Sequence, residues 1–359
     1  MLFRVGINGF GRIARVILRI LEERDTDIEV CAINLHSADT ERMAYLFEYD
    51  SVFGRFKGRV RATDNELVIN GKKILVFSEE DPAKIDWASA GVQYVIETTG
   101  KFRTLEECGK HLEGGAKRVV LTAPGKDSDF PTFVMGVNQE KYDPLTMPII
   151  SNASCTTNCL APLTKVVNDK FGIEKALMST IHAATSKQRP VDSNGGRDWR
   201  TGRSVFNNII PSTTGAAKAV GLVIPELKGK MTGMSFRVPS NDVSVVDLTA
   251  QLKTPTTYEE ICDAIEHASR HEFKGIIEYN HDDIVSSDVR GNYNTCVFDE
   301  KAGIMLDDSF VKLIAWYDNE WGYSNQCIEL VEYIGKKDLK LEKRAKAAEK
   351  AKAAEKTKK

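Results

Sequence analysis

The first 34 residues carry the pattern that most constrains how this chain folds. Residues 3–8 are an apolar, strand-like run, and residues 9–14 read Gly-Phe-Gly-Arg-Ile-Ala. A helical pattern then continues to about Glu23, and residues 28–34 form a second strand-like run. A strand, a G-x-G-x-x-A turn, a helix and a second strand make the dinucleotide fingerprint of doubly wound α/β sheets. The sequence therefore predicts an α/β protein whose first half binds a dinucleotide.

Each small residue of the fingerprint has a physical role. Gly9 permits the tight turn, and Gly11 lets a pyrophosphate approach the backbone amides of Arg12 and Ile13 at the helix start. Ala14 keeps the helix close to the sheet. Glycines often mark only a turn, but here the flanking strands and helix also fit.

Two further segments support a doubly wound sheet. Residues 94–97 and 118–121 are strand-like, and both lead into polar or glycine-containing loops, 98–100 and 122–125. One expected feature is missing from the second strand. A carboxylate should follow it to bind the adenine-ribose hydroxyls, but the chain has Leu35, and the nearest acid is Asp39. Loss of that carboxylate removes the repulsion that excludes a 2′-phosphate.

The segment Ser154-Cys155-Thr156-Thr157-Asn158-Cys159 carries the strongest chemical signal. It lies between a strand-like run, 147–150, and a helix-like run, 160–171. Free amides and the dipole at a helix N-terminus favour a thiolate at Cys155, and the neighbouring hydroxyls can bind an oxygen-rich substrate. An isolated cysteine is usually buried and inert, which is how we interpret Cys159, one helical turn later.

The second half offers partners for such a thiol. His182 ends a short strand pattern and can serve as a base or an acid. A polar run from Thr185 to Arg203 predicts a functional loop. Thr214 and Gly215 open a helical pattern, and Arg237 lies in a strand pattern, so all three are candidate phosphate ligands. Taken alone, His182 could be a structural histidine, the Thr214-Gly215 pair a helix cap, and Arg237 a surface charge.

The bulk properties limit the alternatives. A chain of 359 residues suggests two domains, and 42% hydrophobic and 28% charged residues are typical of globular proteins. No apolar run approaches the ~18 residues that span a membrane. The N-terminus does not resemble a signal peptide. Seven scattered cysteines without metal-ligand spacing indicate reduced thiols, no metal site and a cytoplasmic location.

The net charge of −2 hides a strongly basic C-terminus. Residues 336–359 contain eleven Lys or Arg and four Asp or Glu, a net of +7, which leaves −9 for the remainder. This Ala/Lys/Glu-rich tail has high helix propensity but few large apolar residues. We expect a solvated helix. A basic handle for RNA or an acidic partner is the alternative, and nucleic acid is disfavoured because no aromatic residue is interleaved.

Together these segments resemble the phosphorylating glyceraldehyde-3-phosphate dehydrogenases. The matching motifs are residues 7–13, 153–159, 213–220 and 236–239 and the run 316–324 (Trp-Tyr-Asp-Asn-Glu-Trp-Gly-Tyr-Ser), and the resemblance covers about residues 2 to 336. It implies a Rossmann domain, 1–154 and 319–337, and an α+β catalytic domain with a mixed sheet, 155–318, followed by the basic tail, 338–359. It also implies a homotetramer.

The resemblance further implies oxidation and phosphorylation of D-glyceraldehyde 3-phosphate to 1,3-bisphosphoglycerate, in glycolysis or gluconeogenesis. Cys155 would form a thiohemiacetal and then a thioester that inorganic phosphate attacks. His182 would lower the thiol pKa and take the proton. The other implied contacts are Thr185 and Arg237 for the substrate phosphate, Ser154, Thr156, Thr214 and Gly215 for the attacking phosphate, and Thr122 and Asn319, with Gly9, Gly11, Arg12 and Ile13, for the cofactor.

Three departures from the family pattern concern the cofactor. Leu35 replaces an NAD-selecting aspartate, Glu80 stands where an arginine is common, and Ser193-Asn194 are small polar residues in the loop. The resemblance thus implies NAD, with NADP as a second possibility. Two other functions stay open: an erythrose-4-phosphate dehydrogenase, and a non-catalytic relative that binds nucleotides or RNA.

Overall fold

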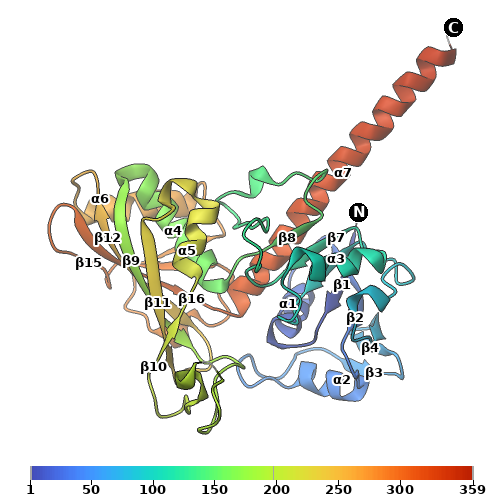
Figure 1. Ribbon diagram of the computed structural model, residues 1–359, viewed down its shortest axis with the longest axis horizontal. Helices are drawn as coiled ribbons and strands as arrows, with labels where there is room; N and C mark the ends of the chain where they lie inside the picture. The colour runs from blue at the N-terminus through green and yellow to red at the C-terminus, as the bar shows by residue number, and fades with distance from the viewer. Residues whose placement is uncertain (1, 197, 358–359) are drawn as a thin grey trace.

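The computed structural model describes residues 2–196 and 198–357 of the chain. The described chain contains two β-sheets, each with its own helices, and a long C-terminal helix that starts between them and projects outwards (Figure 1). The architecture confirms the α/β class and, in the second sheet, the mixed strand arrangement.

The first sheet has the strand order β3-β4-β5-β2-β1-β6-β7-β8. Neighbouring strands in the part β5-β2-β1-β6-β7-β8 pair in parallel, whereas β3 and β4 form an antiparallel edge next to β5. The order reverses direction between β1 and β6, which is the switch point where such sheets bind ligands. The strands are β1 (Phe3–Asn8), β2 (Ile28–Asn34), β3 (Val60–Ala62), β4 (Glu66–Ile69), β5 (Lys72–Phe77), β6 (Tyr94–Glu97), β7 (Arg118–Leu121) and β8 (Ile149–Ser151).

Helices cover both faces of this sheet because its strands are apolar on both sides. Successive residues point to opposite faces, so Ile96 joins the core beneath α1 and α7, whereas Val95 joins a smaller cluster around Trp87. The helices are α1 (Arg12–Glu23), α2 (Thr40–Glu48), α3 (Leu105–Glu113) and α7 (Trp321–Thr357). Helix α7 packs against α1, so the last helix of the chain helps to cover the first sheet.

The second sheet is mixed and has the order β10-β11-β9-β12-β16-β14-β13, with β15 paired to β16. The pairs β11–β9 and β13–β14 are parallel, and the others are antiparallel. The strands are β9 (Ile173–Ala183), β10 (Ile210–Thr213), β11 (Met231–Val238), β12 (Ser244–Leu252), β13 (Ile277–Asn280), β14 (Cys296–Asp299), β15 (Ile304–Met305) and β16 (Phe310–Tyr317).

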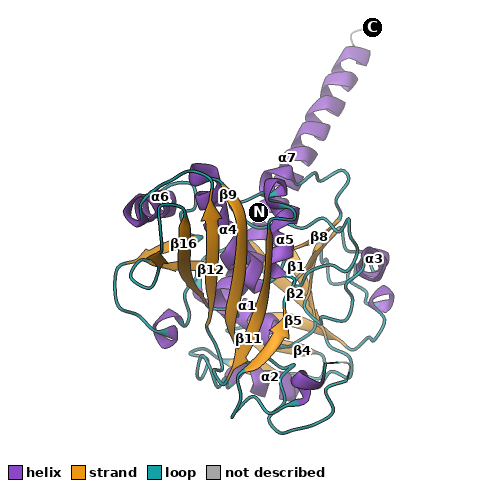
Figure 2. Cartoon of the chain, turned by 60° about the vertical axis from the view of Figure 1, so that its left-hand side comes forward, coloured by secondary structure: helices purple, strands orange, loops and turns teal. Residues whose placement is uncertain are grey.

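Among the described residues, helices cover only one face of the second sheet, as Figure 2 shows. Along β12, buried and half-buried residues alternate strictly, which is typical of a sheet packed on one side. The covering helices are α4 (Cys155–Phe171), α5 (Ala216–Val223) and α6 (Tyr258–Arg270). Exposed apolar side chains, including Leu177 on β9 and Met234 on β11, lie on the other face.

Most of the strands predicted from the sequence have the predicted boundaries in the structure. Residues 3–8, 28–34, 94–97 and 118–121 form strands as predicted. The strand predicted at 147–150 is observed at 149–151, because Met147 still donates its amide to Asp143 O in a preceding turn. Short 3₁₀ turns complete the described secondary structure: Pro82–Lys84, Gln139–Lys141, Trp199–Gly202, Pro225–Leu227 and Ser286–Val289. None of the described helices combines the length and apolar character needed to cross a membrane.

Candidate active site

The glycine turn opens a cavity at the carboxyl ends of β1, β2 and β6. Gly9 has a φ of +102°, and a Cβ on it would lie 2.6 Å from Thr98 Oγ1, so only glycine fits. A Cβ on Gly11 would meet nothing within 4 Å, because this residue, the N-cap of α1, faces open space. The cavity, of about 320 Å³, is lined by residues 8–11, 34–36, 79–80, 98–99 and 101–102. Its glycine cradle and open helix N-terminus fit a dinucleotide pyrophosphate.

Leu35 lines this cavity, whereas Asp39 does not. Asp39 is the N-cap of α2, and its carboxylate accepts a hydrogen bond from the Arg42 amide at 3.0 Å. Glu79 and Glu80 also line the cavity. The cavity lining therefore contains carboxylates at positions 79 and 80, but none at position 35.

The guanidinium of Arg12 is occupied by contacts within the protein, which leaves its backbone amide as the group that could bind a pyrophosphate. Its side chain forms ion pairs with Asp50 and Glu320. The amides of Arg12 and Ile13 lie in the first turn of α1, where helix geometry leaves them without an intrahelical partner. Arg12 thus fastens the start of α1 to the residue that follows Asn319.

The two other predicted cofactor residues also lie at strand ends. Thr122 follows β7, and its hydroxyl donates to Glu97 O at 3.0 Å. Asn319 follows β16, is 6% exposed, and accepts a hydrogen bond from Ser244 Oγ at 2.7 Å. Ser244 Oγ also accepts from the Ala183 amide, at 3.0 Å, and so connects Asn319 with the strand of His182.

Cys155 and His182 come together where the two sheets meet. Cys155 is the first residue of α4, and Ser154 caps the helix by accepting a hydrogen bond from the Thr157 amide. The Cys155 side chain packs against the cores of both sheets. Its Sγ lies 3.5 Å from Nε2 of His182, on β9. The predicted thiol–imidazole pair therefore exists in the structure.

Burial governs the resting charge of this pair. Burial raises the pKa of the Cys155 thiol, although the Arg237 guanidinium and hydrogen bonds from Thr156 act to lower it. Burial, with Arg237, also lowers the pKa of His182 to about 3. The sequence predicts that the helix start favours a thiolate at Cys155, but in the structure desolvation outweighs this effect. The resting pair is a thiol beside a neutral imidazole that can accept its proton.

Arg237 lies beside His182 because β9 and β11 pair in parallel with these two residues in register. Its Nη1 is 2.7 Å from His182 Nδ1 and 3.1 Å from Ala183 O. Nδ1 is also 2.8 Å from Ala183 O. A hydrogen on Nδ1 would donate to that carbonyl, whereas a bare Nδ1 would accept from Arg237. The position of Arg237 is thus linked to the imidazole tautomer.

The remaining predicted phosphate ligands lie on segments that follow strands or open helices. Thr185 is exposed after β9 and donates to Gln188 Oε1 at 3.0 Å, while Thr214 Oγ1 accepts from the Ala216 amide at 3.2 Å near Gly215, the N-cap of α5. Thr156 differs because its hydroxyl is buried and pairs with Tyr317 OH at 2.8 Å. No hydrogen bond among the described residues joins Thr185 or Thr214 to Cys155.

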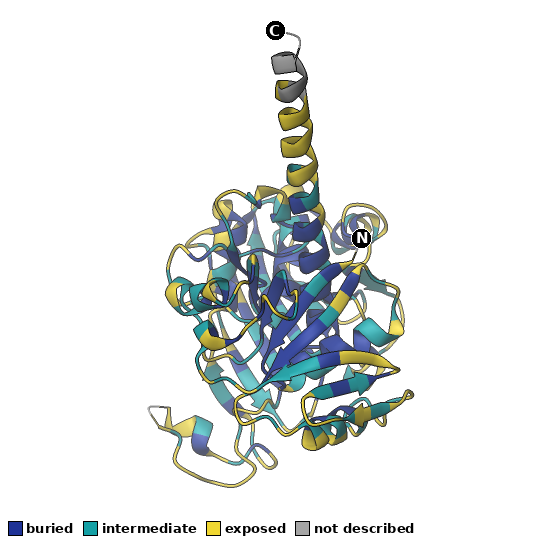
Figure 3. Ribbon diagram, turned by 90° about the vertical axis from the view of Figure 1, so that its right-hand side faces the viewer, coloured by how far each residue is buried: buried dark blue, intermediate teal, exposed yellow. Residues whose placement is uncertain are grey.

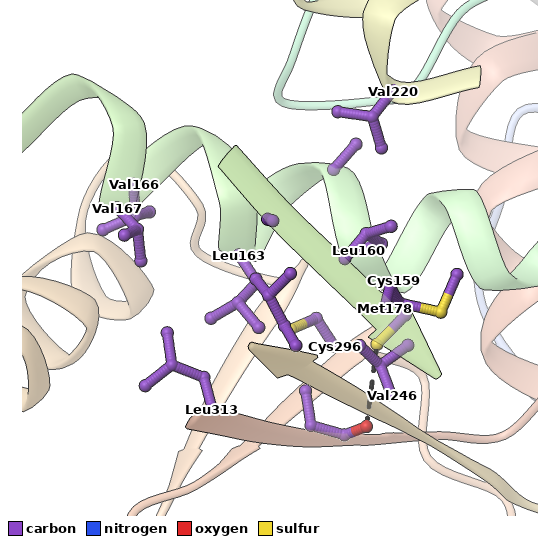
Figure 4. Packing of buried hydrophobic residues seen from close by; sticks show 14 of the residues in the cluster. Cys159, Leu160, Leu163, Val166, Val167, Met178, Val220, Val246, Cys296 and Leu313 are labelled. Atoms are coloured by element: carbon purple, nitrogen blue, oxygen red, sulfur yellow. Dashed lines mark hydrogen bonds between the residues drawn. The ribbon is translucent and has the colours of Figure 1, made fainter. Parts of the chain in front are cut away.

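Cys159 is a packing residue, as predicted. It is fully buried among apolar side chains of α4, β9, β12 and β16, including Leu160, Leu163 and Met178 (Figure 4). Its thiol points to Ala315 O at 3.9 Å, and burial raises its pKa well above the ordinary value. All seven cysteines are free thiols.

A buried polar network beneath the nucleotide cavity escaped the sequence reasoning. Glu97, at the end of β6, accepts hydrogen bonds from Asn8 Nδ2 at 2.6 Å and from the Thr99 amide at 2.7 Å. His111 Nε2 lies 3.0 Å from the same carboxylate, and both side chains are fully buried. The sequence feature that could have predicted this network is the carboxylate of Glu97 at the end of an otherwise apolar strand.

A second group of acids lies between the sheets. Asp242 and Asp318 are both buried, and Asp318 accepts hydrogen bonds from the amides of Gly291, Glu320 and Trp321. Burial, with the negative charges of Asp318 and Glu320, raises the pKa of Asp242 to about 9. Burial and the two neighbouring carboxylates thus both favour the protonated, neutral form of Asp242.

Comparisons with known proteins agree with this geometry. The family model of the glyceraldehyde 3-phosphate dehydrogenase NAD binding domain matches residues 3–105, and the C-terminal domain of the same family matches residues 154–319. The chain belongs to the glyceraldehyde-3-phosphate dehydrogenase family. It is 56% identical over 334 residues to the cytosolic enzyme of Chlamydomonas reinhardtii, covering 93% of this chain and 97% of the relative.

Fungal members of the family are similarly close. Glyceraldehyde-3-phosphate dehydrogenase 1 of Schizosaccharomyces pombe is 56% identical over 335 residues, covering 93% of this chain and 98% of the relative. Glyceraldehyde-3-phosphate dehydrogenase 2 of Agaricus bisporus is 55% identical over 337 residues, covering 94% and 98%. The family resemblance seen in the motifs is therefore confirmed across almost the whole chain.

Proposed function

We propose that this protein oxidises and phosphorylates D-glyceraldehyde 3-phosphate, with NAD(P) and inorganic phosphate, to 1,3-bisphosphoglycerate. The observation that carries the proposal is the 3.5 Å contact between Cys155 Sγ and His182 Nε2 at the start of α4. Family membership and the adjacent dinucleotide cavity support the same reaction. The enzyme acts in glycolysis or gluconeogenesis in the cytoplasm, in accord with its cytosolic relative.

In this reaction Cys155 is the nucleophile and His182 is its proton acceptor. As Sγ bonds to the aldehyde carbon, Nε2 takes the thiol proton, and the imidazolium then stabilises the oxyanion together with the Cys155 amide. The nicotinamide, when bound, supplies the acceptor for the hydride that leaves this carbon. Inorganic phosphate then attacks the carbonyl carbon of the Cys155 thioester, the acyl phosphate forms, and the C–S bond breaks. The Cys155 sulfur leaves as a thiolate and recovers its proton from the His182 imidazolium.

Arg237 couples the substrate phosphate to this proton transfer. Nε2 can accept a proton only if the hydrogen of the neutral ring is on Nδ1, where it donates to Ala183 O. Arg237 competes for Nδ1 until an anion draws it away. A substrate phosphate held by Arg237 and Thr185 also offsets the positive charge that lowers the His182 pKa. Ser154, Thr156, Thr214 and Gly215 bind the attacking phosphate.

The cofactor lies along the carboxyl edge of the first sheet. The amides of Gly11, Arg12 and Ile13 hold its pyrophosphate, and Thr122 and Asn319 hold its nicotinamide end. NAD is the main cofactor and NADP is also accepted, because Leu35 puts no carboxylate against a 2′-phosphate.

The domain division that suits this chemistry places the nucleotide-binding domain at 1–154 and 319–337, the catalytic domain at 155–318 and the basic tail at 338–359. The enzyme is a homotetramer. Exposed apolar side chains on the open face of the second sheet and in the segment between β9 and β10 support this oligomeric state. Each of them is more than 60% exposed: Leu177, Val191, Trp199, Phe206 and Ile209.

The decisive experiment compares two cysteine variants. Cys155→Ser is expected to lower oxidation of glyceraldehyde 3-phosphate by several orders of magnitude, whereas Cys159→Ser, in the same helix, keeps most activity. Initial rates with NAD and phosphate provide the measurement, and erythrose 4-phosphate serves as the competing aldehyde. A Cys155→Ser enzyme with near-normal turnover would disprove the mechanism.

Cofactor choice is tested separately at position 35. Leu35→Asp places a carboxylate in the cavity and should shift the NAD:NADP ratio of kcat/KM toward NAD by at least ~10-fold, or ~1.4 kcal/mol of differential binding. If the native enzyme does not turn over NADP and Leu35→Asp leaves the NAD kinetics unaltered, position 35 does not set cofactor choice.

A further inference from the structure

Acidic and basic residues lie on opposite faces of helix α7 where the helix leaves the body of the protein. At 100° per residue, Asp338, Glu342 and Glu349 fall within a strip about 40° wide. Asp338 pairs with Arg118 at 2.9 Å, and Glu342 pairs with Lys117 at 3.5 Å. The acidic strip therefore turns towards the first sheet, and Asp338 is itself buried.

The opposite side of the same helix is basic. Lys336, Lys340, Lys343 and Arg344 fall within about 100° of one another and lie across the helix from the acidic strip. These four side chains are exposed, and Figure 3 shows α7 changing from buried near the body of the protein to exposed beyond it. Within the described chain, Lys340, Lys343 and Arg344 have no carboxylate within 4 Å, although Lys336 pairs with Glu332 at 3.4 Å. Three adjacent cations thus have only solvent to neutralise them.

An apolar groove lies beside these cations. A cavity of about 710 Å³ separates α7 from the 140–145 segment, and its apolar lining includes Tyr333, Leu145 and Leu341. Leu145 is 74% exposed. Five cationic side chains edge the groove, and they outnumber its two carboxylates, Glu140 and Asp143; the cations are Lys141, Lys336, Lys337, Lys340 and Arg344.

We propose that this basic groove, lined by residues 140–145, 333, 336–337, 340–341 and 344, docks an acidic peptide segment that carries an apolar side chain. The carboxylates of such a segment would meet the unpaired cations, and its apolar residue would cover Leu145 and Leu341. This groove is less suited to binding a nucleic acid. Tyr333 is the only aromatic side chain on the groove that is not buried, and Lys337 lies over its ring at 5.4 Å, so no row of stacking platforms exists.

Binding is tested on the full-length protein with defined probes. A fluorescent peptide of alternating glutamate and leucine is titrated at low ionic strength, because screening weakens exposed charge pairs. A glutamate–serine peptide of equal charge and a single-stranded RNA of equal length are the comparison probes. Lys340→Glu with Arg344→Glu removes two cations of the groove, while Lys57→Glu with Lys274→Glu makes the same charge change at exposed sites elsewhere.

The expected result is a glutamate–leucine peptide that binds at least ~10-fold tighter than the serine peptide or the RNA. The groove double variant should lose at least ~10-fold of this affinity, and the control double variant should keep it. Leu145→Ser should remove the preference for leucine, while all variants keep dehydrogenase activity. Equal binding of both peptides, tighter binding of RNA, or no loss in the groove variant would overturn the proposal.

Discussion

Asp242 provides a quantitative test of the charge arrangement between the two sheets. Its side chain is 2% exposed, and neither carboxyl oxygen has a hydrogen-bond partner among the described residues. Its pKa is raised to about 9, first by burial and then by Asp318 and Glu320. In an unfolded chain the same carboxyl ionises near ~4. Asp242→Asn keeps the shape of this side chain but removes its ionisation.

The sign of the effect follows from proton binding. Between about pH 4 and pH 9, the native state holds a proton on Asp242 that the unfolded chain releases, so the free energy of unfolding falls as pH rises. The contribution of Asp242 to this slope is about 1.4 kcal/mol per pH unit, and only this contribution vanishes in the asparagine variant. Relative to the unchanged protein, Asp242→Asn should therefore gain about 2.7 kcal/mol of stability between about pH 5 and about pH 7.

Urea unfolding, followed by tryptophan fluorescence at several pH values, measures this difference. Asp282→Asn, which makes the same substitution at an exposed aspartate, is the matched control. If the stability difference between Asp242→Asn and the unchanged protein were constant from about pH 5 to about pH 7, Asp242 would be ionised in the native state and the reasoning would be wrong.

Two further predictions concern the thiol and the glycine turn. His182→Asn removes the proton acceptor of Cys155, so the pH at which iodoacetamide alkylation accelerates should rise; an unchanged pH profile would assign thiol activation to the helix start alone. Gly9→Ala should lower the free energy of unfolding by about 1–3 kcal/mol, because its φ of +102° and the Thr98 hydroxyl both oppose a side chain. Gly11→Ala should leave thermal unfolding almost unchanged but weaken NAD binding, measured by calorimetry, since its Cβ points into open space; equal effects of the two alanines on both measurements would contradict this separation.

Local features of the site could be predicted from the sequence, and features that depend on distant contacts could not. The glycine turn and the position of Cys155 at a helix start follow from neighbouring residues. The ion pairs of Arg12 involve residues 38 and 308 positions away, so nothing near Arg12 signals that its guanidinium is occupied. The Thr156 hydroxyl similarly pairs with Tyr317, 161 residues later.

The pKa of Cys155 shows the same limit in energetic terms. The sequence reveals the helix terminus that lowers a thiol pKa, but burial, which raises it, arises only when both sheets close around the sulfur. The shift of the strand at 149–151 has a smaller cause. A turn at Asp143 keeps Met147 out of the sheet, and the apolar pattern alone does not reveal this turn.

The position of α7 affects how the chain folds during synthesis. Ile328, Val331 and Ile334 are fully buried in the same core as β1 and α1, yet they are translated after the whole second sheet. Until they emerge from the ribosome, the face of the first sheet around Val5 and Ile17 lacks its cover and presents an apolar surface to chaperones or to other nascent chains. The nucleotide-binding unit is therefore finished last although it begins first, and premature termination before Trp321 would release an aggregation-prone chain rather than a working half.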